Sequence, residues 1–446
     1  MTDRPLRICF VAYRGNMRCG GQGVYLWFLA RELVRLGHEV DVLVGPPYPD
    51  PMPFARAVEA LPNEQFWARW FERDPAAMLP RPNPLVVYHP LNFYELAASY
   101  FGFLPEPSAF SLRALSAFAK RLRAGHRYDL VHDVQCVGWG LLGIRALGVP
   151  VVTTIHHPLT VDRRASFARD ESLRDAIGSM TFYPVGMQSF VARHIDHVFT
   201  SSEVSAKEIQ RDFGVRADRI SMVANGVDTD LFAPDPSVER NPREILCVGR
   251  ASDPNKGVKT LIEALHQLPD DITLTLVDDD HPDNGARKRA HELGCANRLD
   301  LVGRVPTDEL VHLYRRAAIV AVPSRYEGFG LPAAEAMACG TPVVATRAGA
   351  LPEVLGDHGV LVRRDDAGAL AKGIVSLLEQ PLARAELGER GRNRVVERYS
   401  WDRIAASTAE VYADVVARWR GLPARITTSA SDGARAASQS SPESRV

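Results

Sequence analysis

The sequence predicts an α/β protein built from two consecutive doubly wound domains, and three observations support this fold class. The chain has 446 residues, which is enough for two or three domains of ordinary size. Short apolar runs alternate with amphipathic helical stretches along most of it, which is typical of parallel sheets covered by helices. The alternation stops once, in a proline- and charge-rich stretch at 230–242, and then restarts. Such a stretch is typical of a linker between domains.

The first predicted domain covers 1–230. A buried strand is expected at 7–13 (RICFVAY), followed by a glycine-rich loop and a helix at 24–36 that ends at Gly37. Further strands are expected at the apolar runs 38–44, 128–134, 149–155, 197–202 and 220–228. The stretch 46–120 is rich in proline and aromatic residues and breaks the rhythm. An inserted loop-and-helix region is predicted there, with a separate small domain as the alternative.

The second predicted domain covers 243–395 and repeats the same alternation. Its strands are expected at 244–250, 272–278, 299–303, 318–324, 342–346 and near 360. Its helices are expected at 257–268, 285–293, 308–316 and 333–339. Helical stretches continue beyond it, so a C-terminal helix is predicted over 400–421. The remainder, 422–446, is rich in Ser, Ala and Arg without periodicity and is predicted to be disordered.

Composition and charge argue against several classes of protein. Lys and Arg together number 53 and Asp and Glu 54, so the formal net charge is −1 and no overall field attracts nucleic acid. The six cysteines lie far apart and form no CxxC pair, which excludes a zinc ribbon and favours buried thiols in a reducing compartment. The sequence has no signal-peptide pattern and no run of about 20 apolar residues. A cytoplasmic protein is therefore expected.

The glycine-rich loop at 14–23 joins the first predicted strand to the first helix. Ligands of open α/β sheets bind at such junctions, and glycine amides at the start of a helix suit a phosphate. Gly20 and Gly21 are therefore predicted to contact an anionic ligand. The dinucleotide fingerprint GxGxxG is not matched, because Leu26 stands where its third glycine would be. A tight turn that needs glycine is the alternative.

The second domain has the stronger pattern of chemically active residues. Arg250 ends its first strand and Lys256 precedes the next helix, so two cations at the carboxyl edge of a sheet are predicted to clamp a diphosphate. Glu327 opens a glycine-containing loop, and Glu335 lies on the first turn of a helix, where the helix dipole is an alternative explanation for it. The loop also offers the backbone amides of Phe329, Gly330 and Leu331. Two carboxylates beside such amides suit a polyhydroxylated ligand.

The stretch EGFGLPAAEAMACGTPVV resembles the E-x7-E signature of family 4 retaining glycosyltransferases (glycosyl transferases group 1), with Glu327 and Glu335 as its glutamates. Five other segments resemble motifs of this family: GGQGVYLWFLARELVRLGHEVDVL, VPVVTTIHH, NGVDTDLF, VGRASDPNKGVKTLIEAL and LVGRVPTDELVHLYRRA. The resemblance implies the GT-B fold, in which two Rossmann-like domains face each other across a cleft. The first domain would bind the acceptor and the second the nucleotide sugar, and the helix at 400–421 would cross back to the first domain.

The resemblance also implies a role for each matching residue. Arg250 and Lys256 would hold the diphosphate of the donor and neutralise it as the glycosidic bond breaks. Glu335 would bind the ribose hydroxyls, and Glu327 the transferred sugar. Backbone groups near Val305 would recognise the base.

A histidine after the strand 149–155 and an Asp-x-Asp pair in the second domain each lead to a further expectation. His156 follows the strand VPVVTTI and would meet the donor sugar or the acceptor, with its neighbour His157 as the alternative. Asp278 and Asp280 form an Asp-x-Asp pair that looks like the metal-binding motif of the other glycosyltransferase fold. Because the diphosphate clamp already supplies positive charge, a solvated loop is predicted there and no metal site.

The predicted function is that of a retaining glycosyltransferase. It would move a sugar from a UDP- or GDP-linked donor to a hydroxyl of an acceptor that is a glycan, a lipid or a small molecule, and it would need no other cofactor. The resemblance implies front-side displacement, in which the leaving diphosphate helps to deprotonate the incoming hydroxyl. The alternatives are another GT-B enzyme, such as a nucleotide-sugar 2-epimerase or a phosphorylase, and a catalytically inactive sugar-binding protein.

The segment 93–125 is predicted to contact a membrane peripherally, at its inner face. Aromatic residues cluster at 93–103, and a basic helical stretch follows at 111–125. Its cations are Arg113, Lys120, Arg121 and Arg123. Cations near an anionic leaflet add about 1 kcal/mol each to membrane binding. One alternative is that the same surface seats a lipid-linked or bulky aromatic acceptor. The other is that the aromatic residues pack onto the first domain and the cations are solvated.

Overall fold

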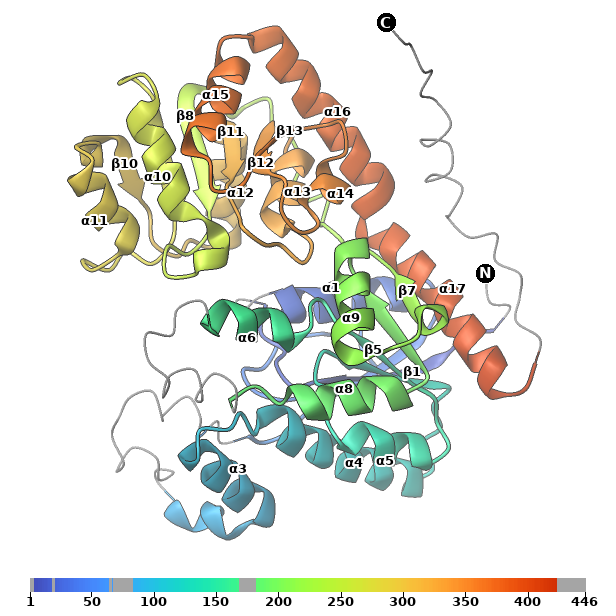
Figure 1. Cartoon of the computed structure of the whole chain (residues 1–446). Coiled ribbons are helices and arrows are strands. Elements are labelled where there is room, and N and C mark those ends of the chain that lie inside the picture. Colours follow the sequence, from blue (N-terminus) through green and yellow to red (C-terminus); the bar gives the residue numbers. More distant parts are fainter. Residues whose placement is uncertain (1–3, 18–20, 64–65, 67–82, 168–181, 423–446) are drawn as a thin grey trace, which may run out of the picture.

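The computed structural model describes residues 4–17, 21–63, 66, 83–167 and 182–422. They form two α/β units, each with one parallel sheet between layers of helices (Figure 1). This arrangement confirms the predicted fold class. The carboxyl-terminal ends of both sheets lie toward the boundary between the units, where Ser201 of the first unit bonds to Gly328 of the second.

The first sheet has seven strands in the order β3-β2-β1-β4-β5-β6-β7. Their bounds are β1 (Arg7–Ala12), β2 (Glu39–Val44), β3 (Ala57–Ala60), β4 (Leu130–Val134), β5 (Val151–Thr154), β6 (His197–Thr200) and β7 (Ile220–Met222). In the central strand β1, the run from Ile8 to Ala12 is fully buried. A strand covered on both faces needs a continuous apolar run rather than an alternating one, which is why this strand was readable in the sequence.

The helices of the first unit are α1 (Gly21–Arg35), α3 (Pro90–Tyr100), α4 (Glu106–Arg123), α5 (Gly140–Ala146), α6 (Leu159–Phe167), α8 (Val185–His194) and α9 (Glu203–Phe213), with the 3-10 turns η1 (Pro84–Tyr88) and η2 (Ala217–Arg219). Helices α1, α4, α5, α8 and α9 cover the two faces of the first sheet, whereas α3 packs on η1 and α4. One hydrophobic core lies under α1, and a second lies on the opposite face under α4, α5 and α8.

The predicted insertion at 46–120 is wrong for two of its parts. Strand β3 pairs in parallel with β2 at the edge of the sheet, and α4 contributes Phe110 and Phe118 to the core. These elements continue the doubly wound pattern. Strand β3 could not be recognised in the sequence because it is a four-residue edge strand without an apolar run. Its residues alternate between half-buried and exposed.

The second sheet has six strands in the order β10-β9-β8-β11-β12-β13. Their bounds are β8 (Asn241–Val248), β9 (Thr273–Val277), β10 (Leu299–Leu301), β11 (Ala317–Val322), β12 (Val343–Thr346) and β13 (Val360–Val362). The helices are α10 (Val258–Gln267), α11 (Gly285–Glu292), α12 (Thr307–Arg316), α13 (Leu331–Ala338), α14 (Leu351–Leu355), α15 (Ala367–Leu378) and α16 (Pro381–Tyr399), with the 3-10 turns η3 (Pro254–Lys256) and η4 (Ala296–Arg298). Two hydrophobic cores enclose this sheet.

The last described helix, α17 (Trp401–Trp419), leaves the second unit and lies against the first (Figure 1). Trp401 stacks on Phe28 of α1, with 5.6 Å between the ring centroids. Near the other end, Arg420 forms an ion pair with Asp129 of the first unit. The helix predicted at 400–421 thus packs on the first unit, whereas the tail predicted to be disordered lies almost wholly outside the described residues.

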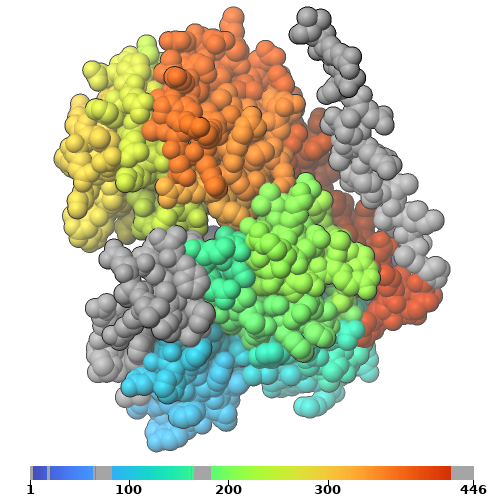
Figure 2. Space-filling model, in the orientation of Figure 1, coloured from blue at the N-terminus to red at the C-terminus, as the bar shows by residue number. Residues whose placement is uncertain are grey.

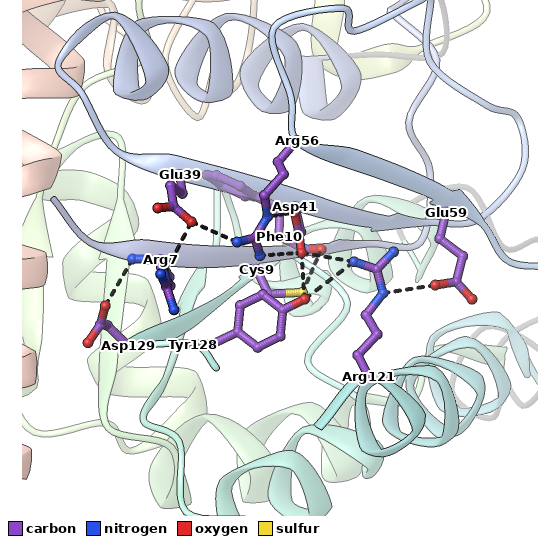
Figure 3. Close-up of polar contacts among 10 residues, drawn as sticks. All are labelled: Arg7, Cys9, Phe10, Glu39, Asp41, Arg56, Glu59, Arg121, Tyr128 and Asp129. Atoms are coloured by element: carbon purple, nitrogen blue, oxygen red, sulfur yellow. Dashed lines mark hydrogen bonds and ion pairs between the residues drawn. The ribbon is translucent and has the colours of Figure 1, made fainter. Parts of the chain in front are cut away.

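An ionic network fixes α4 to the edge of the first sheet (Figure 3). Asp41 of β2 is fully buried, and it accepts hydrogen bonds from Arg56 at 2.8 Å, Arg121 at 3.0 Å and Tyr128 at 2.5 Å. Burial alone would raise the pKa of Asp41, but the bonds from Arg56 and Tyr128 hold it below its usual value. Arg121 of α4 also bonds to Glu59 of β3 at 2.9 Å.

The predicted basic membrane surface is therefore wrong for two of its four cations. Arg121 is engaged by Asp41, and Arg113 is buried and donates to buried Glu95 at 2.6 Å. Lys120 and Arg123 are exposed. The aromatic part of the prediction lies at the surface, where the exposed residues are Phe93, Tyr94, Tyr100, Phe101 and Phe103. Membrane contact stays a prediction that rests mainly on these side chains.

Two further expectations concern the whole chain. Among the described residues, no helix combines the length and the apolar character needed to cross a bilayer. The buried thiols are Cys9, Cys136, Cys247, Cys295 and Cys339, none of which forms a disulfide. Cys19 lies outside the described residues.

Candidate active site

A pocket of about 240 Å³ lies at the carboxyl-terminal ends of β8 and β9. In a doubly wound sheet this edge is where ligands bind. The lining residues are Val248, Gly249, Arg250, Lys256, Val277, Asp278, Asp279, Arg304 and Pro332. Three cations, Arg250, Lys256 and Arg304, are therefore among the residues around one small hollow, which suits a ligand with several negative charges.

Lys256 ends the short turn η3, and Gly257 after it begins α10 with a φ of +62°. The Nζ atom of Lys256 lies 2.8 Å from Oε1 of Glu327. Burial alone would lower the pKa of Lys256, but the charge of Glu327 outweighs this effect and raises it above its usual value. The amine is therefore a fixed positive charge at neutral pH.

Arg250 and Arg304 complete the cationic lining. Arg250 follows β8, Arg304 follows β10, and both side chains are exposed. Neither guanidinium has a hydrogen-bond or ion-pair partner in the part of the chain that the structure describes. The sequence predicted Arg250 but missed Arg304, although its place just after the third strand of this domain is a signal of the same kind.

Glu327 lies in the loop between β11 and α13 and is 8 % exposed. One carboxylate oxygen accepts bonds from Lys256 at 2.8 Å and from the hydroxyl of Ser324 at 2.7 Å. The carbonyl oxygen of Glu327 accepts a bond from the amide of Ala350 at 2.9 Å. Both the side chain and the backbone of Glu327 are thus held in place. Its contact with Lys256, which lines the pocket, was not predicted from the sequence.

Glu335 lies on α13, where the hydroxyl of Tyr314 donates to its Oε2 at 2.8 Å. Burial raises the pKa of Glu335 to about 7, although the bond from Tyr314 acts in the opposite direction. The carboxyl can therefore be either ionised or protonated near neutral pH. Either form can accept a hydrogen bond from a hydroxyl group of a ligand.

This raised pKa predicts a pH-dependent stability. A carboxyl with a higher pKa in the folded protein stabilises it most below the unfolded value of 4.5, and this contribution is lost as the pH rises through about 7. Glu335→Gln keeps an acceptor for Tyr314 and cannot ionise. We expect its melting temperature to gain a few degrees on wild type between about pH 5 and pH 8. Exposed Glu386→Gln serves as the control, and parallel curves for wild type and Glu335→Gln would refute the shift.

His156 lies just after β5, and its ring meets the ring of Tyr25 edge-on at 4.9 Å. Burial and, secondarily, His157 lower the pKa of His156 to about 3, so the imidazole is neutral at physiological pH. Neither of its ring nitrogens has a partner at hydrogen-bond geometry among the described residues, although the nearby side chain of Asn225 partly opposes the lowering of the pKa. The ring of His157 instead lies 6.5 Å from that of Tyr326 in the second unit. A neutral His156 can donate one hydrogen bond and accept another.

Of the other residues predicted to contact the ligand, one lies close to the boundary between the units and two have side chains packed within the protein. Gly21 begins α1, and a Cβ added to it would lie 3.4 Å from a methyl group of Leu331, so these two residues from different units lie close together. Gly20 lies outside the described residues. By contrast, the side chain of Phe329 turns away to pack against Tyr399 at 5.4 Å. The side chain of Val305 packs against a core of the second unit, which leaves its backbone as the part that can recognise a ligand.

The Asp-x-Asp pair is engaged within the protein. Asp278 accepts bonds from the amide of Ala251 at 2.7 Å and from Asn284 at 2.8 Å. Asp280 forms an ion pair with Arg287. Within the described ranges, no group of three acidic, histidine or cysteine side chains could together hold a metal ion. These bonds hold the loop in place. The prediction of a solvated loop is wrong for Asp278, which is buried.

Family models match both halves of the chain. A model described as Glycosyltransferase Family 4 matches residues 19–231, and one described as Glycosyl transferases group 1 matches residues 229–394. The solved structures that share the fold include sucrose-phosphate synthase from Thermosynechococcus elongatus, with a TM-score of 0.67, 24% identity and coverage of 93% of this chain and 100% of that one. They also include Anabaena HepE in complex with UDP and glucose, with a TM-score of 0.64, 22% identity and coverage of 92% and 99%.

Two curated relatives extend over nearly the whole chain. An MMP alpha-(1->4)-mannosyltransferase of Mycolicibacterium hassiacum is 40% identical over 420 residues, which is 93% of this chain and 99% of the relative. A D-inositol 3-phosphate glycosyltransferase of Xylanimonas cellulosilytica is 31% identical over 435 residues, 91% of this chain and 94% of the relative. These names favour glycosyl transfer over the epimerase alternative. The chain belongs to the family 4, group 1 glycosyltransferases and has their GT-B fold.

Proposed function

We propose that this glycosyltransferase moves a hexosyl group, with retention of configuration, from a nucleoside diphosphate sugar to a carbohydrate hydroxyl. The observation that carries the proposal is the pocket in which Arg250, Lys256 and Arg304 surround the carboxyl edge of the second sheet. A diphosphate is the anionic part of such a donor, and several fixed cations match its charge. The bond between Glu327 and Lys256 supports the proposal that Glu327 would meet the sugar beside the diphosphate.

The proposed reaction needs electrostatic stabilisation rather than a protein nucleophile. The bond between the anomeric carbon and the diphosphate oxygen breaks, and the acceptor oxygen bonds to the same face of that carbon. The acceptor proton passes to the leaving diphosphate. Arg250 and Lys256 stabilise the charge that develops on the leaving group. His156, neutral because burial lowers its pKa to about 3, would orient sugar or acceptor hydroxyls by hydrogen bonds instead of acting as a base.

We propose mannose as the transferred sugar. The support is the mannosyltransferase relative, which is 40% identical to this chain across 93% of its length. The acceptor would then be a mannose-containing glycan extended by an α-(1→4) bond. Inositol phosphate glycosyl transfer is the competing assignment, because the second relative carries that name at 31% identity.

The test has two stages. Thermal shift with UDP, GDP and ADP identifies the base, since a ligand at about 100 times its dissociation constant adds about 2.7 kcal/mol of stability. GDP-mannose, UDP-glucose and UDP-N-acetylglucosamine are then each offered with α-(1→4)-linked mannosides and with inositol 3-phosphate. Mannosylation of the mannosides is the expected product. Transfer only to inositol phosphate would replace the acceptor assignment, and no response to any nucleotide would overturn the donor site.

We expect transfer to be independent of divalent metal. Arg250, Lys256 and Arg304 supply positive charge at the pocket, while Asp278 and Asp280 are engaged by neighbouring groups of the protein. Product formation is measured after treatment with EDTA and again after addition of Mg²⁺ or Mn²⁺. Unchanged rates support the cationic clamp. Loss with EDTA and recovery with metal would make the Asp-x-Asp loop a ligand site.

A further inference from the structure

The loop that carries Glu327 is held by the first unit on both sides of this residue. The hydroxyl of Tyr326 donates to Oε2 of Glu208 on α9 at 2.6 Å. The carbonyl oxygen of Gly328 accepts a bond from the hydroxyl of Ser201, just before α9, at 3.2 Å. Both neighbours of Glu327 in the chain thus bond across the boundary between the units.

A third contact joins the same helix to the second unit. The carboxylate of Glu353 on α14 accepts bonds from the amides of Glu203 at 2.8 Å and Val204 at 3.2 Å. These are the first amides of α9, which have no partner within the helix. The third amide, that of Ser205, is capped locally by Ser202. Glu353 of the second unit therefore caps the N-terminus of α9 in the first unit with a negative charge, which the helix dipole favours.

These contacts lie where the units touch, and the packing around them is incomplete. In Figure 2 the green region that contains α9 abuts the orange second unit. A pocket of about 180 Å³ lies beside them. Its lining consists of Ser201, Ser202, Met222, Ala224, Phe329, Ala350, Glu353, Val354 and Tyr399. Polar contacts beside a cavity can break without exposing a closely packed apolar core, so the units can separate here.

The position of the Glu327 carboxylate depends on the conformation of the loop that carries it. Its carboxylate bonds to Lys256 and Ser324, whereas its backbone is fixed by Ala350. A shift of Tyr326 or Gly328 would therefore move the carboxylate relative to Lys256. The geometry required for glycosyl transfer is sensitive to displacements of this kind.

We propose that Tyr326 and Glu353 are positioning residues that couple closure of the two units to the orientation of Glu327. This inference rests on the proposed role of Glu327 at the donor sugar. In the closed arrangement, the bonds to Glu208 and to the first amides of α9 hold the loop in place. When the units separate to admit the donor or release the nucleotide, these bonds break and the loop is no longer fixed from both sides.

The variants are Tyr326→Phe, Glu353→Ala and Glu353→Gln. Glu353→Gln keeps one oxygen that can accept a bond from the α9 amides, so it tests the loss of charge if Glu353→Ala fails to fold. The matched controls are Tyr88→Phe on η1 and Glu386→Ala on α16, both at exposed positions. Three properties are measured: binding of GDP and UDP, the kcat and KM of transfer, and amide exchange of the peptide around 198–213. We expect nucleotide dissociation constants within about twofold of wild type, kcat at least fivefold lower with little change in KM, and faster exchange in Glu353→Ala.

The outcomes separate this inference from the proposed function. Unchanged kcat and exchange in the folded Tyr326 and Glu353 variants would overturn the coupling, as would equal losses in the controls. A parallel loss of nucleotide affinity would also overturn it, because the residues would then act on binding and not on orientation. If wild type binds neither GDP nor UDP, the proposed function fails, whereas faster exchange in Glu353→Ala would still establish the contact between the units.

Discussion

Replacing Arg250 by Ala or Lys256 by Ala is expected to lower turnover at least about tenfold while the fold stays intact. Both side chains line the pocket beyond the apolar run of β8, so neither supports the core. Each would stabilise negative charge that develops mainly in the transition state, where about 1.4 kcal/mol corresponds to a factor of ten. Lys256→Ala has a second consequence, because Glu327 then loses its partner at 2.8 Å. We expect its effect on turnover to equal or exceed that of Arg250→Ala.

Turnover is measured at saturating donor, together with the melting temperature. Two controls remove cations from the elements next to these residues: Arg243→Ala near the start of β8 and Lys259→Ala on the exposed face of α10. Both should retain wild-type turnover. Full activity of Arg250→Ala and Lys256→Ala with donor bound would contradict the clamp.

Gly349→Ala is expected to cause a large loss of stability. Gly349 has a φ of +53°, and a Cβ there would lie 2.1 Å from the carbonyl oxygen of Glu327. The left-handed backbone costs an L-residue roughly 1–2 kcal/mol, and the forced backbone shift adds roughly 1–3 kcal/mol. At about 2–4 °C per kcal/mol for a unit of this size, the melting temperature should fall by roughly 4–20 °C. Transfer should fall as well, since the displaced backbone carries Glu327.

Gly294→Ala isolates the part of this effect that comes from the clash. Gly294 has a φ of +72°, but nothing lies within 4 Å of its added Cβ. This control should show only the smaller loss caused by backbone strain, with normal turnover. Equal losses in the two variants would mean that the Glu327 loop yields to the added methyl group.

The central part of the fold was readable because burial on both faces leaves a continuous apolar run, as in β1 and β11. Strand β3 was not, since an edge strand alternates and is short. The error over α4 has a different origin. The helix sequence shows Arg113 and Arg121 as cations, but their partners Glu95 and Asp41 lie elsewhere in the chain and only folding brings them together.

In the active site too, residues marked by their place after a strand were predictable, whereas contacts formed only by folding were not. Arg250, Lys256 and Glu327 were predictable because each follows a strand at the carboxyl edge of one sheet, which folding places side by side. Arg304 follows the same rule and was overlooked. The contacts of Tyr326 and Glu353 with α9 were beyond sequence reasoning, since they depend on how two separately formed units pack together.

The most direct test of the diphosphate clamp compares nucleotides that differ by one phosphate. Calorimetric titration measures GDP against GMP and UDP against UMP, with wild type and with a double variant that carries Arg250→Ala and Lys256→Ala. Wild type should bind one diphosphate at least tenfold more tightly than its monophosphate, and the double variant should lose that preference. Equal affinities for the two nucleotides in wild type, or an undiminished preference in the double variant, would contradict the assignment of this pocket to the donor.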